Sequence, residues 1–241
     1  MLRALLILAA GVAWISAHAE TLELPDSGGL SYERYPASGR YLLLWIASER
    51  GLADTERFAA QKLAGSGMEV WQLDPAASYW LPQLPSSMDA VPTRDIGHWV
   101  ETAIATGKQV RVLAVSHAAK PVLLALSVLP ERERAKICVA LLYPNLYSKV
   151  DPLDSPSYLS LGRQDGLQAL ILQPQKSAAT PWLPDLVDSM IGTGMRVQSA
   201  ILDKLREGYW VREEANAFEI ESGKALDKML TQQFDTWACG K

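Results

Sequence analysis

The sequence predicts one α/β domain built on a doubly wound, mostly parallel sheet of about six or more strands with flanking helices. Six apolar runs have the length of a strand, and stretches with helical periodicity separate most of them. The runs are continuously apolar, which indicates strands that are buried on both faces. A parallel sheet with helices on both sides has this order and this burial. The runs cover residues 41–48, 68–73, 110–115, 137–142, 167–172 and 197–202.

Four segments carry apolar residues at helical spacing and are expected to form helices. They are residues 54–64, 95–105, 184–190 and 222–234. The first two end at glycines, which is typical of crossover helices. The longest irregular stretches are 76–93 and 144–166, and each follows a strand. Loops at the carboxyl ends of parallel strands form ligand sites, so these two stretches are expected to wall a pocket.

The N-terminal residues have the pattern of a secretory signal peptide. Arg3 precedes an apolar run that ends at Ile15, and Ala17 and Ala19 fit the A-x-A cleavage pattern. The run is too short to cross a bilayer, and no basic flank follows it. We expect cleavage before Glu20, which leaves residues 20–241 as one domain in the periplasm or outside the cell. The alternative is a retained membrane anchor.

Charge and hydropathy narrow the classes of partner. The formal net charge is −4, and it becomes −5 without Arg3 because 22 basic residues then face 27 acidic ones. Basic residues are scattered among acids, so nucleic acid is not an expected partner. No apolar stretch beyond residue 20 is long enough to cross a membrane. We expect neither a cofactor nor a metal ion.

The two cysteines leave one question open. Cys138 lies inside the apolar run 137–142, and Cys239 lies near the C-terminus. Export would permit a disulfide between them. A buried Cys138 with a free Cys239 thiol fits the sequence equally well, because pairing depends on a separation that the sequence does not give.

The third apolar run is followed by a serine that is a candidate catalytic nucleophile. The buried strand runs directly into Ser116, and an apolar helix begins at once. A turn this sharp requires small residues two positions before and after, and these are Ala114 and Ala118. The segment resembles the G-x-S-x-G nucleophile elbow of the α/β-hydrolase superfamily, with alanine at both glycine positions. The alternative is a serine that caps a core helix.

The resemblance covers most of the chain after residue 40, without a large inserted cap domain. It implies an oxyanion loop after the first run, near residues 46–51, and a second backbone donor at His117. It also implies an acid and a histidine after the later strands, in the order Ser, Asp, His. Here the sequence departs from the family: Ser177 stands at the position of the acid and Tyr209 at the position of the histidine.

No histidine follows the elbow, since the chain's three histidines are His18, His98 and His117. His117 adjoins the serine, and its side chain is expected to point away from the serine oxygen. His98 lies in the helix predicted at 95–105 and is a candidate base only if it comes within hydrogen-bond reach. Tyr209 is a further candidate base, because Lys204 lies nearby in sequence and a cation lowers the pKa of a phenol.

Tryptophans follow several of the predicted strands. At a pocket mouth their rings would suit a small apolar, aromatic or acyl ligand. An equal alternative is that they fill the core. The candidate binding residues are His117, Trp45, Trp80, Trp182 and Trp210.

Two functions follow from these observations. The first is a non-catalytic protein that binds a ligand or an envelope protein partner, because the usual acid and base are both replaced while the fold and pocket remain. The second is a serine ester hydrolase or acyl transferase, with Ser116 as nucleophile and His98 or Tyr209 as an unusual base.

Overall fold

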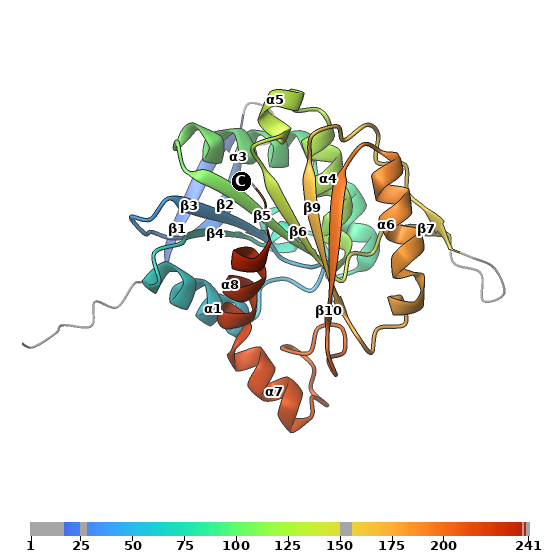
Figure 1. The fold of residues 1–241 in the computed structure, drawn as a ribbon. Helices are drawn as coiled ribbons and strands as arrows, with labels where there is room; N and C mark the ends of the chain where they lie inside the picture. The colour runs from blue at the N-terminus through green and yellow to red at the C-terminus, as the bar shows by residue number, and fades with distance from the viewer. Residues whose placement is uncertain (1–16, 25–27, 150–155, 238, 240–241) are drawn as a thin grey trace, which may run out of the picture.

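The computed structural model describes residues 17–24, 28–149, 156–237 and 239. Of the predicted signal peptide, residues 1–16 lie outside the described part. An eight-stranded sheet forms the centre of the molecule, with the strand order β1-β2-β4-β3-β5-β6-β9-β10 (Figure 1). The predicted α/β architecture with a mostly parallel sheet is confirmed.

All six predicted strands are present and lie side by side. Adjacent strands within this group of six pair in parallel, which agrees with continuous apolar runs that helices cover on both faces. They are β3 (Tyr41–Ile46), β4 (Glu69–Leu73), β5 (Gln109–Val115), β6 (Cys138–Leu142), β9 (Gln168–Pro174) and β10 (Arg196–Leu202).

Two further strands extend the sheet at one edge and were not predicted. β1 (His18–Leu24) pairs antiparallel with β2 (Gly28–Tyr35), and β2 pairs antiparallel with β4. In β2, Leu30 and Tyr32 are buried while Ser31 between them is exposed. This alternation is typical of a strand with one solvent-facing side.

Helices cover the sheet on both faces and enclose two apolar cores. On one face lie α3 (Thr93–Ala105), α4 (Ala119–Ser127) and α6 (Leu183–Gly192), and on the other lie α1 (Asp54–Gly65) and α8 (Leu226–Thr236). The helix predicted at 222–234 is in fact two helices, because α7 (Ala217–Lys224) ends before Ala225 and α8 starts anew. No helix in the described residues is both long and apolar enough to span a bilayer.

The stretches expected to be irregular contain short elements. The first holds α2 (Pro75–Ser78) and the 3₁₀ helix η1 (Pro85–Ala90). The second holds β7 (Tyr147–Lys149) and β8 (Ser157–Tyr158), which form a separate two-stranded ribbon. A four-residue helix, α5 (Glu131–Arg134), precedes β6.

The open question about the cysteines is answered by a disulfide. Cys138 at the start of β6 is bonded to Cys239, with 5.9 Å between the Cα atoms. The bond ties the segment after α8 to the amino end of a central strand. It closes a loop of 101 residues.

Candidate functional site

The turn at Ser116 has the strained geometry expected of a nucleophile elbow. β5 ends at Val115, a single 3₁₀ turn η2 (Ser116–Ala118) follows, and α4 begins directly after it. Ser116 has a φ of 55°, in the left-handed region that non-glycine residues rarely occupy. Ala114 and Ala118 are both fully buried, so larger side chains would have no room in this turn. The resemblance in sequence therefore extends to the backbone.

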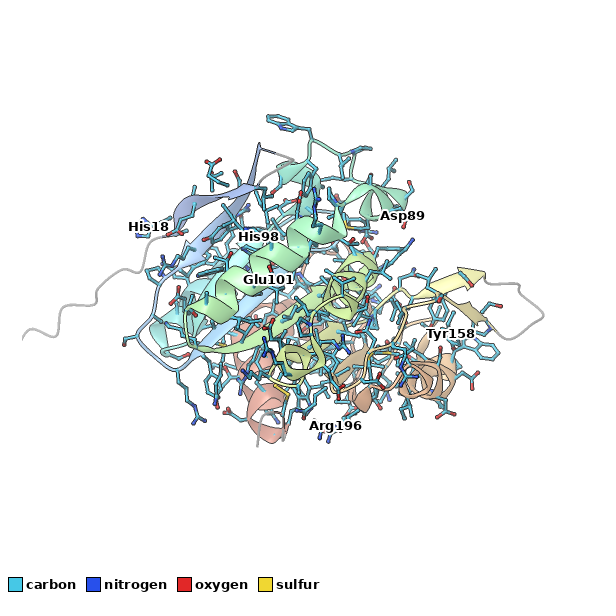
Figure 2. The ribbon with its side chains drawn as sticks, turned by 90° about the horizontal axis from the view of Figure 1, so that it is seen from above. His18, Asp89, His98, Glu101, Tyr158 and Arg196 are labelled. Atoms are coloured by element: carbon cyan, nitrogen blue, oxygen red, sulfur yellow. A yellow bond between two sulfur atoms is a disulfide. The ribbon has the colours of Figure 1, made fainter. Side chains whose placement is uncertain are left out.

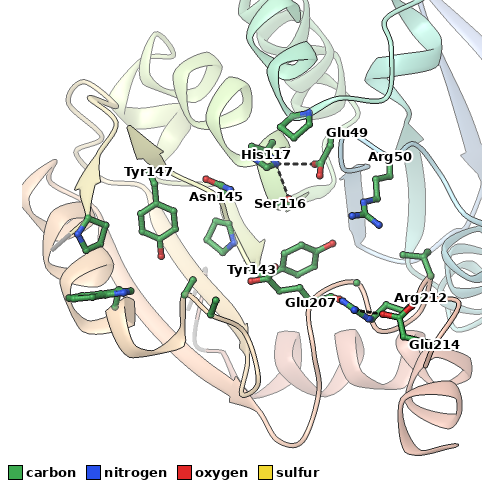
Figure 3. Close-up of a pocket in the computed structure, with 18 of the residues that line it drawn as sticks. Glu49, Arg50, Ser116, His117, Tyr143, Asn145, Tyr147, Glu207, Arg212 and Glu214 are labelled. Atoms are coloured by element: carbon green, nitrogen blue, oxygen red, sulfur yellow. Dashed lines mark hydrogen bonds and ion pairs between the residues drawn. The ribbon is translucent and has the colours of Figure 1, made fainter. Parts of the chain in front are cut away.

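A cavity of about 770 Å³ opens beside Ser116 at the carboxyl edge of the sheet. Its walls come from the segments that follow β3, β5, β6, β9 and β10, which is where ligands bind in open parallel sheets. Figure 3 shows the side chains that project into it. They include Glu49, Arg50, Ser116, His117, Tyr143, Asn145, Tyr147, Trp182, Glu207 and Arg212.

Three side chains form a polar cluster at the top of this cavity. The Oγ atom of Ser116 lies 3.2 Å from Nδ1 of His117, and the same Nδ1 lies 3.2 Å from Oε2 of Glu49 (Figure 3). The expectation that the His117 side chain points away from the serine oxygen is therefore wrong. The tight turn places the two consecutive side chains on the same side of the elbow.

This cluster differs from a catalytic triad in how the imidazole is used. In a triad, one ring nitrogen takes the serine proton while the other donates to the acid. Here a single nitrogen faces both the serine and the carboxylate. Because a ring nitrogen is either a donor or an acceptor, an Nδ1–H that donates to Glu49 cannot accept the proton of Ser116. The pairing with Glu49 favours that donor form.

Glu49 carries a negative charge beside the serine. Burial alone would raise the pKa of Glu49, but hydrogen bonds from His117, from its own backbone N–H and from Ser116 outweigh burial and lower it. The carboxylate is thus ionised at neutral pH. A fixed negative charge at this position opposes the oxyanion that forms when a serine attacks an ester.

The loop after β3 was expected to supply oxyanion donors, but most of its N–H groups are already bonded. Ala47 donates to the carbonyl of Leu73, at 2.9 Å. Arg50 and Gly51 both donate to oxygens of Ser48, at 3.2 and 3.0 Å. Leu52 donates to Asp74, at 3.0 Å, and Glu49 donates to its own carboxylate. Little donor capacity therefore remains in this loop for a substrate.

The two residues at the positions of the family's acid and base, Ser177 and Tyr209, do not contact each other in the way that an acid and a histidine do in a triad. The hydroxyl of Ser177 donates to the carboxylate of Glu207, which lies in the loop after β10 and lines the cavity. Tyr209 itself is 1% exposed and packs edge-on against Trp210, with 4.9 Å between the ring centres. Burial raises the pKa of Tyr209, so its phenol stays protonated at neutral pH. Tyr209 does not line the cavity around Ser116.

His98 is also placed away from the serine. It lies on the outer face of α3, where its Nδ1 atom is 3.7 Å from Glu101 (Figure 2). It is absent from the walls of the cavity. The side chain is 44% exposed, which is typical of a solvated helix position. The structure thus brings only His117, of the two histidine candidates, to Ser116.

The four candidate tryptophans lie in different environments. Trp182 lines the cavity. Trp45 is fully buried in β3, and Trp210 is buried beside Tyr143, so both serve the core. Trp80 is 94% exposed and lies outside the cavity. Only Trp182 is available to a ligand next to Ser116.

Sequence reasoning missed Glu49 and Glu207. Glu49 follows the first predicted strand, within the stretch compared with an oxyanion loop, so its proximity to the serine was available as a hypothesis. Glu207 lies two residues before Tyr209, in the segment compared with the family's histidine region. Neither glutamate stands at the position where the family carries its acid or its histidine, so the family's motifs do not mark them. Within the described residues, no group of three His, Cys, Asp or Glu side chains is arranged to hold a metal ion.

Comparison with known proteins identifies the fold through similar structures. No family model matches the sequence, and no curated protein matches it. The structure is similar to a putative dienelactone hydrolase from Klebsiella pneumoniae subsp. pneumoniae, with a TM-score of 0.64 and 13% identity over 92% of this chain and 100% of that one. It is also similar to the propionate-bound esterase Est2 from Thermogutta terrifontis, with a TM-score of 0.60 and 13% identity over 92% and 96% of the two chains.

A third similar structure is the esterase Est22, with a TM-score of 0.67 and 10% identity over 92% of this chain and 80% of that one. Identities this low establish the fold alone. The chain has the α/β-hydrolase fold.

Proposed function

We propose that this protein is a non-catalytic binding protein of the cell envelope, in which the cavity beside Ser116 receives a small ligand or a segment of a protein partner. The observation that carries the proposal is the ionised Glu49 carboxylate, which contacts the elbow where a hydrolase needs donors for an oxyanion. The cavity itself is kept, and its volume is within the range of ligand sites.

The cavity walls favour a ligand with an aromatic or acyl portion. Tyr143, Tyr147 and Trp182 present ring surface, and Asn145 provides an amide for orientation. p-Nitrophenyl butyrate combines an acyl chain with a ring and is a suitable probe. We expect it to quench tryptophan fluorescence, and we expect Trp182→Phe to remove most of that quenching. Trp80→Phe is the matched control, because Trp80 lies outside the cavity.

A second candidate is a slow serine acyl transferase or esterase. It is favoured by the strained backbone of Ser116 and by the position of Glu49, whose carboxylate and the Ser116 hydroxyl both lie 3.2 Å from Nδ1 of His117. Glu49 would then act as the base. In that case the proton of Oγ would pass to the Glu49 carboxylate as Oγ attacks the acyl carbon. The ester C–O bond would then break, and Glu49 would return the proton to the alcohol that leaves. The lowered pKa of Glu49 makes it a weak base for this step.

Labelling with a fluorophosphonate probe separates the two candidates, because Glu49 has opposite roles in them. We expect little labelling of Ser116 in the purified protein and little hydrolysis of p-nitrophenyl acetate, since general-base assistance is worth about 10²–10⁴-fold. If the Glu49 charge opposes the reaction, Glu49→Gln raises the labelling rate. If Glu49 is the base, Glu49→Gln abolishes labelling as completely as Ser116→Ala. His98→Ala is the control and should change nothing.

We also propose that the protein is exported and cleaved before Glu20. The pattern of residues 1–19 supports this, and the disulfide is consistent with an oxidising compartment. A chain that begins at Glu20 keeps the hydrogen bonds from Tyr32 and Arg34 to the Glu20 side chain, at 2.9 and 3.1 Å. Intact-mass measurement on protein from the envelope should give Glu20 as the first residue. Recovery of the full-length chain in the membrane fraction would contradict the proposal.

A further inference from the structure

A second group of polar side chains lies at the opposite end of β5 from Ser116. Arg111 is five residues before Ser116 on this strand, or about 17 Å at the rise of an extended chain. Its side chain lies on the sheet face that is covered by α8 and is only 7% exposed. Arginine is rarely buried to this extent without a partner.

Arg111 is held by aromatic rings and by no acid. Its guanidinium carbon lies 3.8 Å from the ring centre of Tyr41 and 4.9 Å from that of Phe234. Its Nη1 atom is buried without a hydrogen-bond partner. Among the described residues Arg111 makes no ion pair. Ring faces attract a guanidinium, but they do not accept the hydrogen bonds that point outward in its plane.

The surroundings of Arg111 add positive charge. The guanidinium of Arg40 lies 4.5 Å from the centre of the same Tyr41 ring, so two cations share one ring. The charge of Asp235 raises the pKa of Arg111, but Asp235 is exposed and lies beyond ion-pair distance. Burial lowers the pKa of Arg111, and the neighbouring Arg40 charge lowers it further. A buried cation in this setting requires a compensating anion.

A cavity of about 200 Å³ lies beside these groups, separate from the cavity at Ser116. Its polar walls are two basic residues, one amide and one acid: Arg40, Arg111, Gln109 and Asp235. Tyr41, Phe234, Trp237 and Cys239 supply the rest of the lining. The disulfide holds Cys239 in place by tying it to β6. The space accommodates a small ion with a few waters, but it is too small for a folded partner.

We propose that this cavity binds a small oxyanion, such as inorganic phosphate, sulfate or a carboxylate. The planar guanidinium of Arg111 presents paired N–H donors that match two oxygens of such an anion, with Arg40 supplying a second charge and the Gln109 amide a further donor. The site is independent of the function proposed for the cavity at Ser116, because the two cavities share no wall residue.

Calorimetric titration of the purified protein tests the site. Sodium phosphate, sodium sulfate and sodium acetate are titrated separately at constant ionic strength, with sodium chloride as the reference. We expect saturable binding of at least one oxyanion. The ranking of the three shows whether a tetrahedral or a planar anion is preferred.

Three variants assign the binding to this cavity. Arg111→Met should abolish it, and Arg40→Gln should weaken the apparent Kd about tenfold, the size expected for one hydrogen bond to a charged group. Arg40 is exposed, so this variant is expected to fold even if Arg111→Met does not. Asp235→Asn should tighten binding by removing a repulsive charge. Arg132→Gln is the control, since Arg132 is 83% exposed on α5.

Each contrary result overturns the proposal. Absence of saturable heat with all three anions would show that the cavity is not an anion site. Equal affinities for the wild type and Arg40→Gln would place the binding elsewhere. If Asp235→Asn lowers the free energy of unfolding without tightening anion binding, Asp235 is itself the counter-ion of Arg111.

Discussion

Tyr209 stands at the position that the sequence resemblance gives to the family's histidine, but its side chain is buried and does not line the cavity beside Ser116. Its hydroxyl is buried and finds no hydrogen-bond partner among the described residues, although its ring packs well against Trp210. An unpartnered buried hydroxyl destabilises a fold by about 1–3 kcal/mol. The position therefore retains packing but gains nothing from the polar atom.

We predict that Tyr209→Phe raises the free energy of unfolding by about 1 kcal/mol or more, because it removes the buried hydroxyl and keeps the ring. Urea unfolding measures the change. Tyr35→Phe is the matched control, since the Tyr35 hydroxyl donates to Glu33 at 2.9 Å and its loss should give no gain. A Tyr209→Phe protein that is less stable than the wild type would reveal a partner for the hydroxyl.

At the scale of a secondary-structure element, the first turn of α1 contains a buried acid. The carboxylate of Glu56 accepts a hydrogen bond from the backbone N–H of Ala53, at 2.8 Å, and so caps the helix. Glu56 is 2% exposed, and burial raises its pKa from 4.5 to about 7. Below that pH the acid is neutral in the fold, whereas in the unfolded chain it is already ionised above about pH 4.5.

This difference predicts a pH dependence of stability. The folded protein holds one more proton than the unfolded chain between pH 4.5 and 7, so the free energy of unfolding falls by about 3 kcal/mol as the pH rises through this window. Glu56→Gln keeps an acceptor for Ala53 and never ionises. Urea unfolding from pH 4.5 to 8 should show a flatter profile for the variant. Parallel profiles would mean that Glu56 does not titrate in this range.

Some of the strands and helices could be predicted from the sequence, and others could not. The six central strands were predicted because burial on both faces gives continuous apolar runs. β1 and β2 were missed because one face of each is polar, which leaves an alternating pattern such as Leu30, Ser31 and Tyr32. The break between α7 and α8 was missed because Ala225 carries no helix-stopping signal.

The candidate site was less predictable than the fold. Ser116 and its turn were predicted from Ala114 and Ala118, since local sterics govern that geometry. The approach of Glu49 to His117 depends on how the loop after β3 packs against the elbow, and spacing in the sequence does not give this contact. Site residues from different strands meet only through tertiary structure.

For the whole molecule, the disulfide is expected to contribute a large part of the free energy of unfolding. A closed loop of 101 residues contributes about 4–5 kcal/mol when its entropy is removed from the unfolded chain. We predict that Cys239→Ser lowers the free energy of unfolding by about that amount, measured by urea unfolding without reductant. With reductant, the wild type should fall to the level of the variant, while Cys138→Ala/Cys239→Ser should not respond. A wild type insensitive to reductant would contradict this role.

The same bond has a consequence for the order of events during synthesis. Cys239 is made 101 residues after Cys138, a delay of about 5–20 s at ordinary rates of translation. During that interval the chain holds no second cysteine with which Cys138 can pair, and β9, the strand beside β6, is itself made within it. The last segment must then reach a thiol at the amino edge of the sheet. If Cys138 attacked a disulfide of another molecule before that moment, it would form a mixed disulfide and release one thiol of that molecule, and the bond to Cys239 would then be unmade.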